Sequence, residues 1–188
     1  MTGLRLAGGM AAILALIMSS TSSVAQEAKS VRADLKGPAS RTLAPNFALH
    51  DAPGKIMRLS DYRGQVVLLD FWATACGGCV QEIPMFIEVA SAYKPRGLQA
   101  IGVSEDIVYE NLKNADEAWR RVTPFVREWK VPYPIVMGDS RVTADYDIKA
   151  LPLTYLIDRK GRIAATYPGV VERTSLETNI KALLAEAR

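Results

Sequence analysis

The sequence has little of the residue types on which most metal chemistry depends, with one histidine and two cysteines among 188 residues. These three side chains do not complete a closed four-ligand zinc site. The net charge of +3 is small and scattered, so nucleic acid is not expected as a partner. The shares of hydrophobic residues, 49%, and charged residues, 23%, are typical of a globular protein. What remains is a folded domain whose reactive side chains are one pair of cysteines, with no cofactor or metal expected.

The N-terminal segment has the pattern of a secretory signal. Arg5 precedes a largely apolar run over residues 6–18, and small residues lead up to Ala25. A positive start, an apolar middle and small residues before the cut are typical of such signals. The apolar run is shorter than the roughly 20 residues of a spanning helix. We therefore expect a signal peptide over residues 1–25 and a periplasmic location, with an uncleaved membrane anchor at residues 4–18 as the alternative.

The rest of the chain alternates between segments typical of strands and of helices. A run over residues 66–72 is apolar except for Asp70, as in a strand that is buried on both faces. A helix is predicted from about Cys76, because apolar residues then recur at helical spacing. The patterns also predict strands on either side of a turn at 51–55, strands over 98–103 and 134–137, a hairpin over 154–167, and a closing helix over 174–187. One α/β domain is expected.

Two other segments give weaker signals. Residues 26–43 are polar and predict a flexible lead-in, so the folded domain is expected over residues 44–188. Thr123 followed by Pro124 predicts the start of a helix, because Thr is favoured as an N-cap and Pro at the first helical position.

The motif Cys76-Gly77-Gly78-Cys79 lies between the predicted buried strand and the predicted helix. Free amide groups at a helix N-terminus stabilise a thiolate, which is the nucleophile of disulfide exchange. A purely structural disulfide is one alternative, but closing so short a ring contributes only about 2 kcal/mol. A metal site is another, although two thiolates and the remote His50 fall short of a full ligand set. The motif therefore favours a redox pair in which Cys76 attacks and Cys79 resolves the mixed disulfide.

Two acidic residues are candidates for proton transfer at this pair. Asp70 interrupts the apolar strand, where burial disfavours its charged form. Glu82 follows Cys79 by three residues, on the same face of the predicted helix. A carboxylate whose pKa burial has raised is suited to accept the proton of the second thiol. The alternatives are a structural buried acid at Asp70 and a solvated first-turn residue at Glu82.

Beyond these residue patterns, the chain resembles a known family. Residues 68–79 look like the active-site stretch of thioredoxin-fold proteins. Further matches indicate one group of this fold, the TlpA/ResA-type thiol–disulfide oxidoreductases, and the resemblance extends over residues 44–169. These matches lie at residues 44–47, 59–64, 82–84 and 151–158, and at Gly161. The resemblance implies a thioredoxin-like α/β fold with a central mixed β-sheet flanked by helices. It also implies an inserted segment between the third strand and the second helix, which residues 104–130 fit.

The family likeness also implies roles for individual residues. Pro152 would be a cis proline facing the disulfide, with Leu151 before it presenting its backbone to a substrate chain. Trp72 would be an aromatic residue beside the site that contacts the substrate chain, with ordinary core packing as the alternative. Glu82 matches a buried Glu of the family. The implied partners are proteins with exposed disulfides and a membrane thiol donor that re-reduces the pair. Reduction during cytochrome c or copper-site maturation is the implied activity, with membrane contact only if the N-terminal segment is retained.

Several positions depart from the family pattern. Ala75 replaces the Trp that commonly precedes the first cysteine, which opens the rim of the site. Gly77 and Gly78 lack the usual proline, so the loop is less rigid. A peroxidase of the peroxiredoxin type needs a Thr three residues before its reactive cysteine, and Ala73 holds that place.

The acidic residues also depart from the pattern. Asp70 is typical of thioredoxins, whereas TlpA/ResA-type proteins often carry Asn there. The Lys that pairs with this Asp in thioredoxins has no counterpart in residues 98–103.

Besides the reduction of protein disulfides, two other functions stay open. One is an oxidant or isomerase on the same fold, and the other is a Cu(I) metallochaperone that uses both cysteines as ligands.

Overall fold

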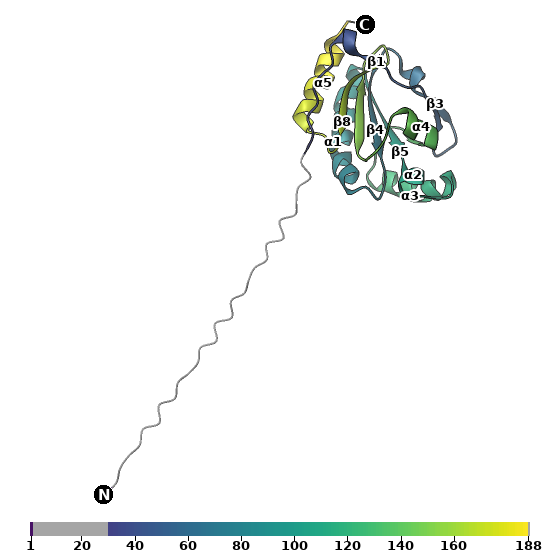
Figure 1. Cartoon of the computed structure of the whole chain (residues 1–188), viewed down its shortest axis with the longest axis vertical. Helices are drawn as coiled ribbons and strands as arrows, with labels where there is room; N and C mark the ends of the chain where they lie inside the picture. The colour runs from purple at the N-terminus through teal and green to yellow at the C-terminus, as the bar shows by residue number, and fades with distance from the viewer. Residues whose placement is uncertain (2–29, 188) are drawn as a thin grey trace.

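Six strands form one mixed β-sheet, in the order β1-β8-β7-β4-β5-β6, and two more form a separate hairpin (Figure 1). The computed structural model describes Met1 and residues 30–187, so the predicted signal segment lies almost wholly outside the described residues. Within them, no helix combines the length and apolar character of a membrane span. The strands are β1 (Thr42–Leu43), β2 (Ala48–His50), β3 (Ile56–Arg58), β4 (Val66–Trp72), β5 (Leu98–Ser104), β6 (Ile135–Met137), β7 (Leu153–Ile157) and β8 (Arg162–Pro168). The helices are α1 (Gly77–Tyr93), α2 (Asp106–Tyr109), α3 (Ala115–Glu128), α4 (Ser140–Asp145) and α5 (Arg173–Ala185), with 3-10 turns η1 (Pro38–Ser40), η2 (Leu59–Tyr62) and η3 (Lys94–Arg96).

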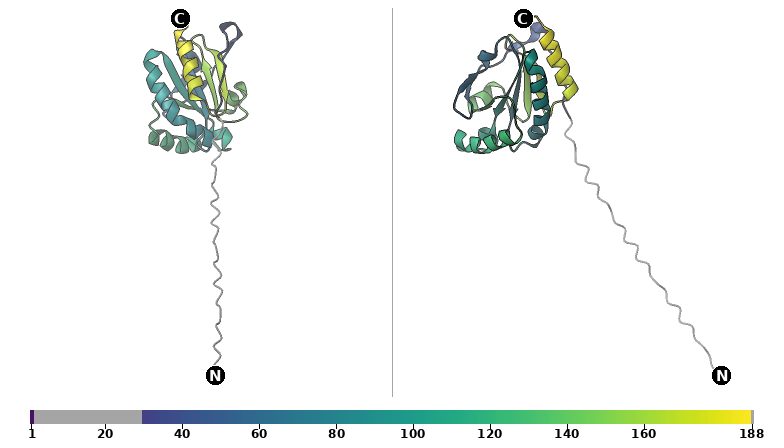
Figure 2. Two further views of the ribbon diagram at one scale, coloured as in Figure 1. Left: turned by 90° about the vertical axis from the view of Figure 1, so that its left-hand side faces the viewer. Right: turned by 180° about the vertical axis from the view of Figure 1, so that it is seen from behind.

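Strand β4 lies inside the sheet, parallel to β5 and antiparallel to β7. All seven of its residues are buried, because α1 and α5 cover one face of the sheet while α4 and the β2–β3 hairpin cover the other (Figures 1 and 2). This explains why the strand is apolar without alternation. The predicted central strand, its neighbour β5, the β7–β8 hairpin and the closing helix are confirmed, as is a central mixed sheet flanked by helices.

The predicted insertion lies between β5 and β6, where the chain forms α2 and α3. The expected helix start at Thr123 and Pro124 is wrong, because both lie inside α3. The helix begins after Asn114, whose side chain accepts a hydrogen bond from the Glu117 amide at 3.0 Å. Asn is a favoured N-cap, and it satisfies one of the free amides of the first turn.

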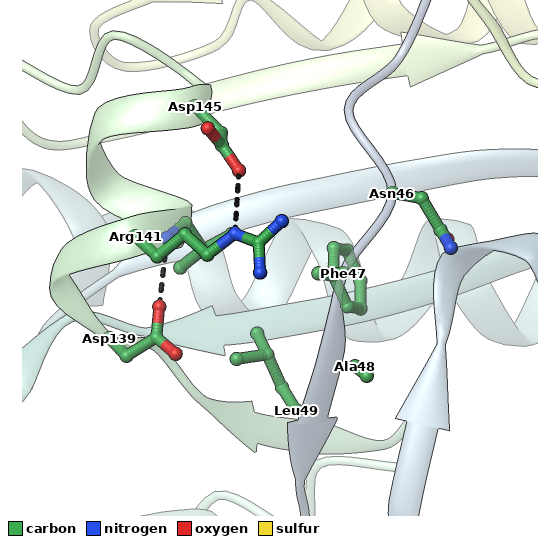
Figure 3. Close-up of a pocket in the computed structure, with 8 residues that line it drawn as sticks. Asn46, Phe47, Ala48, Leu49, Asp139, Arg141 and Asp145 are labelled. Atoms are coloured by element: carbon green, nitrogen blue, oxygen red, sulfur yellow. Dashed lines mark hydrogen bonds and ion pairs between the residues drawn. The ribbon is translucent and has the colours of Figure 1, made fainter.

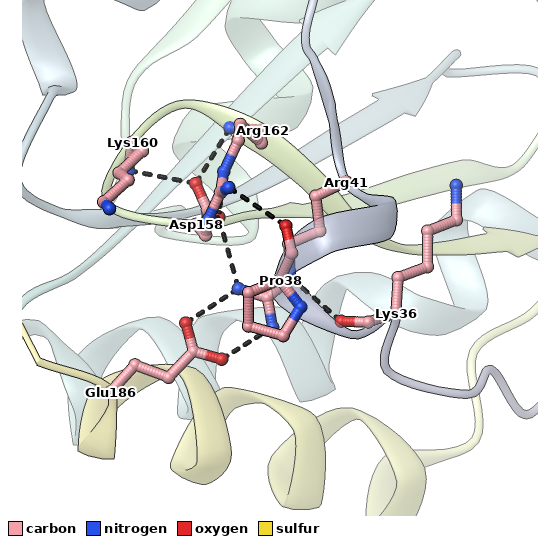
Figure 4. A network of polar contacts seen from close by, with 7 residues as sticks. All are labelled: Lys36, Pro38, Arg41, Asp158, Lys160, Arg162 and Glu186. Atoms are coloured by element: carbon pink, nitrogen blue, oxygen red, sulfur yellow. Dashed lines mark hydrogen bonds and ion pairs between the residues drawn. The ribbon is translucent and has the colours of Figure 1, made fainter.

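The structure also differs from the expectation of a flexible lead-in, since residues 31–43 pack against the domain. Val31 forms an isolated parallel bridge with Val171, and β1 pairs with β8 at the edge of the sheet. Arg41 is buried and binds Asp158 and Glu186, which lie far along the chain (Figure 4). These contacts are long-range, so the local polarity of the segment did not indicate them.

Candidate redox site

The two cysteines lie where β4 ends and α1 begins, and they form a disulfide with a Cα–Cα distance of 5.2 Å. Cys76 is the N-cap of α1, and its Sγ accepts a hydrogen bond from the Cys79 amide at 3.2 Å. Cys76 is 4% exposed and Cys79 is 2% exposed. The pair thus lies in the field of the helix N-terminus, as the sequence predicts.

Pro152 lies directly against the cysteine motif. The Leu151–Pro152 peptide bond is cis, as the family likeness implies. A Cβ placed on Gly78 would lie 3.3 Å from Cδ of Pro152 and 3.2 Å from Cγ2 of Val170. Gly78 therefore leaves room for close approach of two other segments, which explains the absence of a larger residue at this position.

Asp70 lies in the middle of β4, on the face that also carries Trp72. Its carboxylate is completely buried and accepts a hydrogen bond from the Thr154 hydroxyl at 3.4 Å. No ion pair joins it to another described residue, and burial raises the pKa of Asp70. The residue opposite it on β5 is Gly102, which has no side chain that could pair with the Asp70 carboxylate.

Glu82 is buried in α1, with 2% exposure, so it is not a solvated first-turn residue. Its Oε1 accepts a hydrogen bond from the Val171 amide, and its Oε2 has no partner among the described residues. Burial and, secondly, the charge on Asp70 raise the pKa of Glu82, while the hydrogen bond from Val171 lowers it. The two candidate acids therefore influence each other inside the protein.

Sequence reasoning missed Tyr133, which comes just before β6. Its buried hydroxyl has no partner among the described residues. Burial, followed by the charges on Asp70 and Glu82, raises the pKa of Tyr133. The only local sign in the sequence is a tyrosine between Pro132 and Pro134, which does not indicate contact with a residue on another strand.

Trp72 does not lie at the surface beside the disulfide. It is fully buried and packs on Phe125 of α3, with ring centroids 5.2 Å apart. The expected direct contact of Trp72 with a substrate chain is therefore corrected to a role in the core. Leu151 is half-buried, next to Pro152.

The rim of the site is formed by short segments around the cysteines. Ala75 is exposed, and the preceding Thr74 is held by Asp106, which accepts a hydrogen bond from its amide at 3.1 Å. Val108 and Tyr109, on α2, are exposed apolar side chains. A hollow of about 230 Å³ reaches from this helix to Leu151. The hollow thus lies between the exposed side chains of α2 and the residue that precedes the cis proline.

A second hollow, of about 250 Å³, lies between Phe47 and α4 (Figure 3). Arg141 and Asp145 form an ion pair there at 3.6 Å, and Asp139 accepts a hydrogen bond from the Val142 amide. None of the candidate redox residues lines this hollow.

Comparison with known proteins agrees with this geometry. The AhpC/TSA family model matches residues 41–166. Thiol-disulfide oxidoreductase ResA of Geobacillus kaustophilus is 32% identical over 141 residues, covering 74% of this chain and 75% of that protein. ResA of Bacillus subtilis is 31% identical, covering 71% and 69%. A structure from Chlorobium tepidum, assigned as thiol:disulfide interchange protein DsbE, superposes with a TM-score of 0.66 at 28% identity, covering 84% of this chain and 100% of that one.

Proposed function

Because the chain belongs to the AhpC/TSA family and to its ResA-type thiol–disulfide oxidoreductases, we propose that it reduces disulfides of specific protein partners outside the cytoplasm. The observation that carries this proposal is the Cys76–Cys79 disulfide at a helix N-terminus, beside Pro152 and in the same core layer as two buried acids. The predicted signal over residues 1–25 supports the location.

The proposed reaction has two exchange steps. The Cys76 thiolate attacks one sulfur of a substrate disulfide, forming a mixed disulfide, and the other substrate sulfur leaves as a thiolate that takes up a proton. Cys79 then loses its proton and attacks Sγ of Cys76. This forms the Cys76–Cys79 disulfide and releases the second substrate thiol. Two electrons pass to the substrate, and a membrane thiol donor restores the reduced pair.

We assign the proton of Cys79 to Glu82. Both residues lie on one face of α1, and the Oε2 atom of Glu82 has no partner among the described residues. Burial raises the pKa of Glu82 toward that of a thiol, which favours proton exchange between them. The charge on Asp70 raises the pKa of Glu82 further. Leu151 and Pro152 form the edge on which the substrate chain lies.

The electrostatics favour a reductant. Asp70 in β4 and Glu82 in α1 are both buried, and neither forms an ion pair with a cation in the described part of the chain. No cation beside these acids stabilises a thiolate within the described residues, and a less stable reduced form gives up electrons more readily. A reductant of this kind suits the maturation of cytochrome c or of copper sites, where cysteines must be kept as thiols.

Trapping partners in the secreting cell tests the proposal. Cys79→Ala cannot resolve the mixed disulfide, so we expect it to accumulate covalent adducts on Cys76 that thiol reagents release. Cys76→Ala is the matched control and should trap none. Equal trapping by both variants would overturn the assignment of the nucleophile. A redox titration against glutathione tests the direction, since a potential in the range of strong oxidants would contradict a reductant.

A further inference from the structure

The connection between β8 and α5, residues 169–172, contacts three separate parts of the redox site. The Gly169 amide donates a hydrogen bond to the carbonyl oxygen of Pro152 at 3.0 Å. Cγ2 of Val170 lies against Gly78 in the cysteine motif. The Val171 amide donates to Oε1 of Glu82, which is the one hydrogen bond that this carboxyl makes within the described residues. The position of this connection therefore decides how Glu82 is held.

The lead-in segment holds the same connection from its other side. The Val31 amide donates to the carbonyl oxygen of Val170 at 2.6 Å, and the Glu172 amide donates to the carbonyl oxygen of Val31 at 2.9 Å. These two hydrogen bonds bracket Val171. The Cγ2 atom of Val31 would lie 3.0 Å from a Cβ on Gly169, so the Val31 side chain also lies against the backbone of Gly169.

Further contacts fix the lead-in two residues beyond Val31. The Ala33 amide donates to Oγ of Ser175 at 3.2 Å, and the Asn179 side chain donates to the Ala33 carbonyl oxygen at 2.8 Å. Ser175 and Asn179 belong to α5 and are buried. The bridge at Val31 is therefore anchored to a helix of the core.

We propose that Val31 is a positioning residue for the redox site: by pairing with Val170 and Glu172, it fixes the Val171 amide on Glu82 and so sets how readily Glu82 takes the proton of Cys79. This inference rests on the proposed role of Glu82. The lead-in segment thereby helps to control proton transfer at the redox site.

The groups that face Glu82 are few. Asp70 comes from β4, Tyr133 from the segment before β6, and Cys79 from α1 itself, with Cys76 as the N-cap of that helix. The connection contributes only the backbone of Val171. A hydrogen bond to a carboxylate stabilises its charged form, so loosening the Val171 amide raises the pKa of Glu82.

The test uses the reduced protein and an aromatic disulfide, 5,5′-dithiobis(2-nitrobenzoic acid). Attack by Cys76 releases the first coloured thiolate, and attack by Cys79 on the mixed disulfide releases the second. The rate of the second release, followed by stopped flow across pH, reports the deprotonation of Cys79. Val31→Pro removes the amide that binds Val170, and we expect the pH limb of this step to move to higher pH by about one unit.

Matched variants separate this effect from a general loss of structure. Val31→Thr keeps the amide and the branched side chain, and it should keep the wild-type profile. Asp34→Pro changes an exposed residue of the same segment whose amide donates to no described residue, and it should also leave the profile in place. If Val31→Pro does not fold, Ser175→Ala replaces it, because it frees the Ala33 amide and should shift the limb in the same direction.

The outcomes distinguish the two proposals. A limb that disappears in Glu82→Gln and shifts in Val31→Pro supports both. A limb that disappears in Glu82→Gln but stays in place in Val31→Pro, or in Ser175→Ala where that variant is used, overturns the role of Val31 alone. A limb unchanged in Glu82→Gln overturns the proposed role of Glu82 itself.

Discussion

Two groups of acids, Asp158 with Glu186 and Asp70 with Glu82, differ in whether a cation accompanies them. Asp158 and Glu186 both bind Arg41, with nitrogen–oxygen distances of 3.2 and 2.6 Å, and Asp158 also binds Arg162 (Figure 4). Burial alone would raise the pKa of Asp158, but hydrogen bonds from Arg162 and Arg41 bring it below its usual value. A hydrogen bond from Arg41 likewise lowers the pKa of Glu186.

Asp70 and Glu82 have no such partner among the described residues, and burial raises the pKa of both. A carboxylate fixed by arginine stays charged at neutral pH and serves to join distant segments. A buried carboxyl group without a cation gains or loses its proton well above the usual pH range of a carboxyl group. The difference explains why one group holds the lead-in to α5 while the other is suited to proton transfer.

Breaking the paired group should have the largest effect. Arg41→Met leaves Asp158 buried with only one of its two cations, so we expect a loss of about 3 kcal/mol in the free energy of unfolding. Urea titration at neutral pH measures it. The control is Arg173→Met, which removes exposed ion pairs with Glu88 and Glu177 and should leave the free energy of unfolding nearly unchanged. Equal losses in the two variants would contradict the structural role of Arg41.

Glu82→Gln should slow chemistry without weakening the fold. The amide keeps the shape of the side chain but cannot accept the proton of Cys79, so the resolving step should slow by about 10²-fold. Rapid-mixing kinetics with a disulfide substrate measures the step. Glu88→Gln changes an exposed residue of the same helix and should react as the wild type does. A Glu82→Gln protein that resolves at the normal rate would show that another group takes the proton.

Asp70→Asn should have a smaller effect on the same step. Removing the charge of Asp70 lowers the pKa of Glu82, and a shift of one unit changes the fraction of charged Glu82 by about tenfold on its acidic side. The pH profile should therefore move to lower pH while its maximum changes little. A larger loss of rate than in Glu82→Gln would make Asp70 the direct acceptor.

Glu105 is a further buried acid, and it directly follows β5 rather than lying in β4 or α1. Burial raises its pKa from 4.5 to about 7, and its Oε2 accepts a hydrogen bond from Thr143 at 2.6 Å. A raised pKa contributes stability below pH 4.5 that is lost as pH rises through about 7. Glu105→Gln should thus be more stable than the wild type above pH 7 by about 3 kcal/mol, as thermal unfolding across pH would show. An equal pH dependence in both proteins would contradict this.

Much of the redox site follows from local sequence. The apolar run of β4, the cysteine spacing and the helix that follows are properties of neighbouring residues, and the structure confirms them. The burial of Glu82 is not local, because the Val171 amide that binds it lies 89 residues away. The same applies to the lead-in, whose Arg41 meets Glu186 only in the folded chain. The sequence alone did not predict these long-range partners. It also missed Asn114 as the N-cap of α3, because Thr123 and Pro124 favoured a later helix start.

Asp70 and Glu82 should exchange protons well above the usual range of a carboxyl group, whereas the arginine-bound acids should not. Carbon-13 NMR of the side-chain carboxyl groups, followed across pH in one sample of the full domain, tests it directly. We expect Asp70 and Glu82 to titrate above their usual range, and Asp158 and Glu186 below theirs. Titration of Asp70 and Glu82 at ordinary or lowered pH would contradict the account.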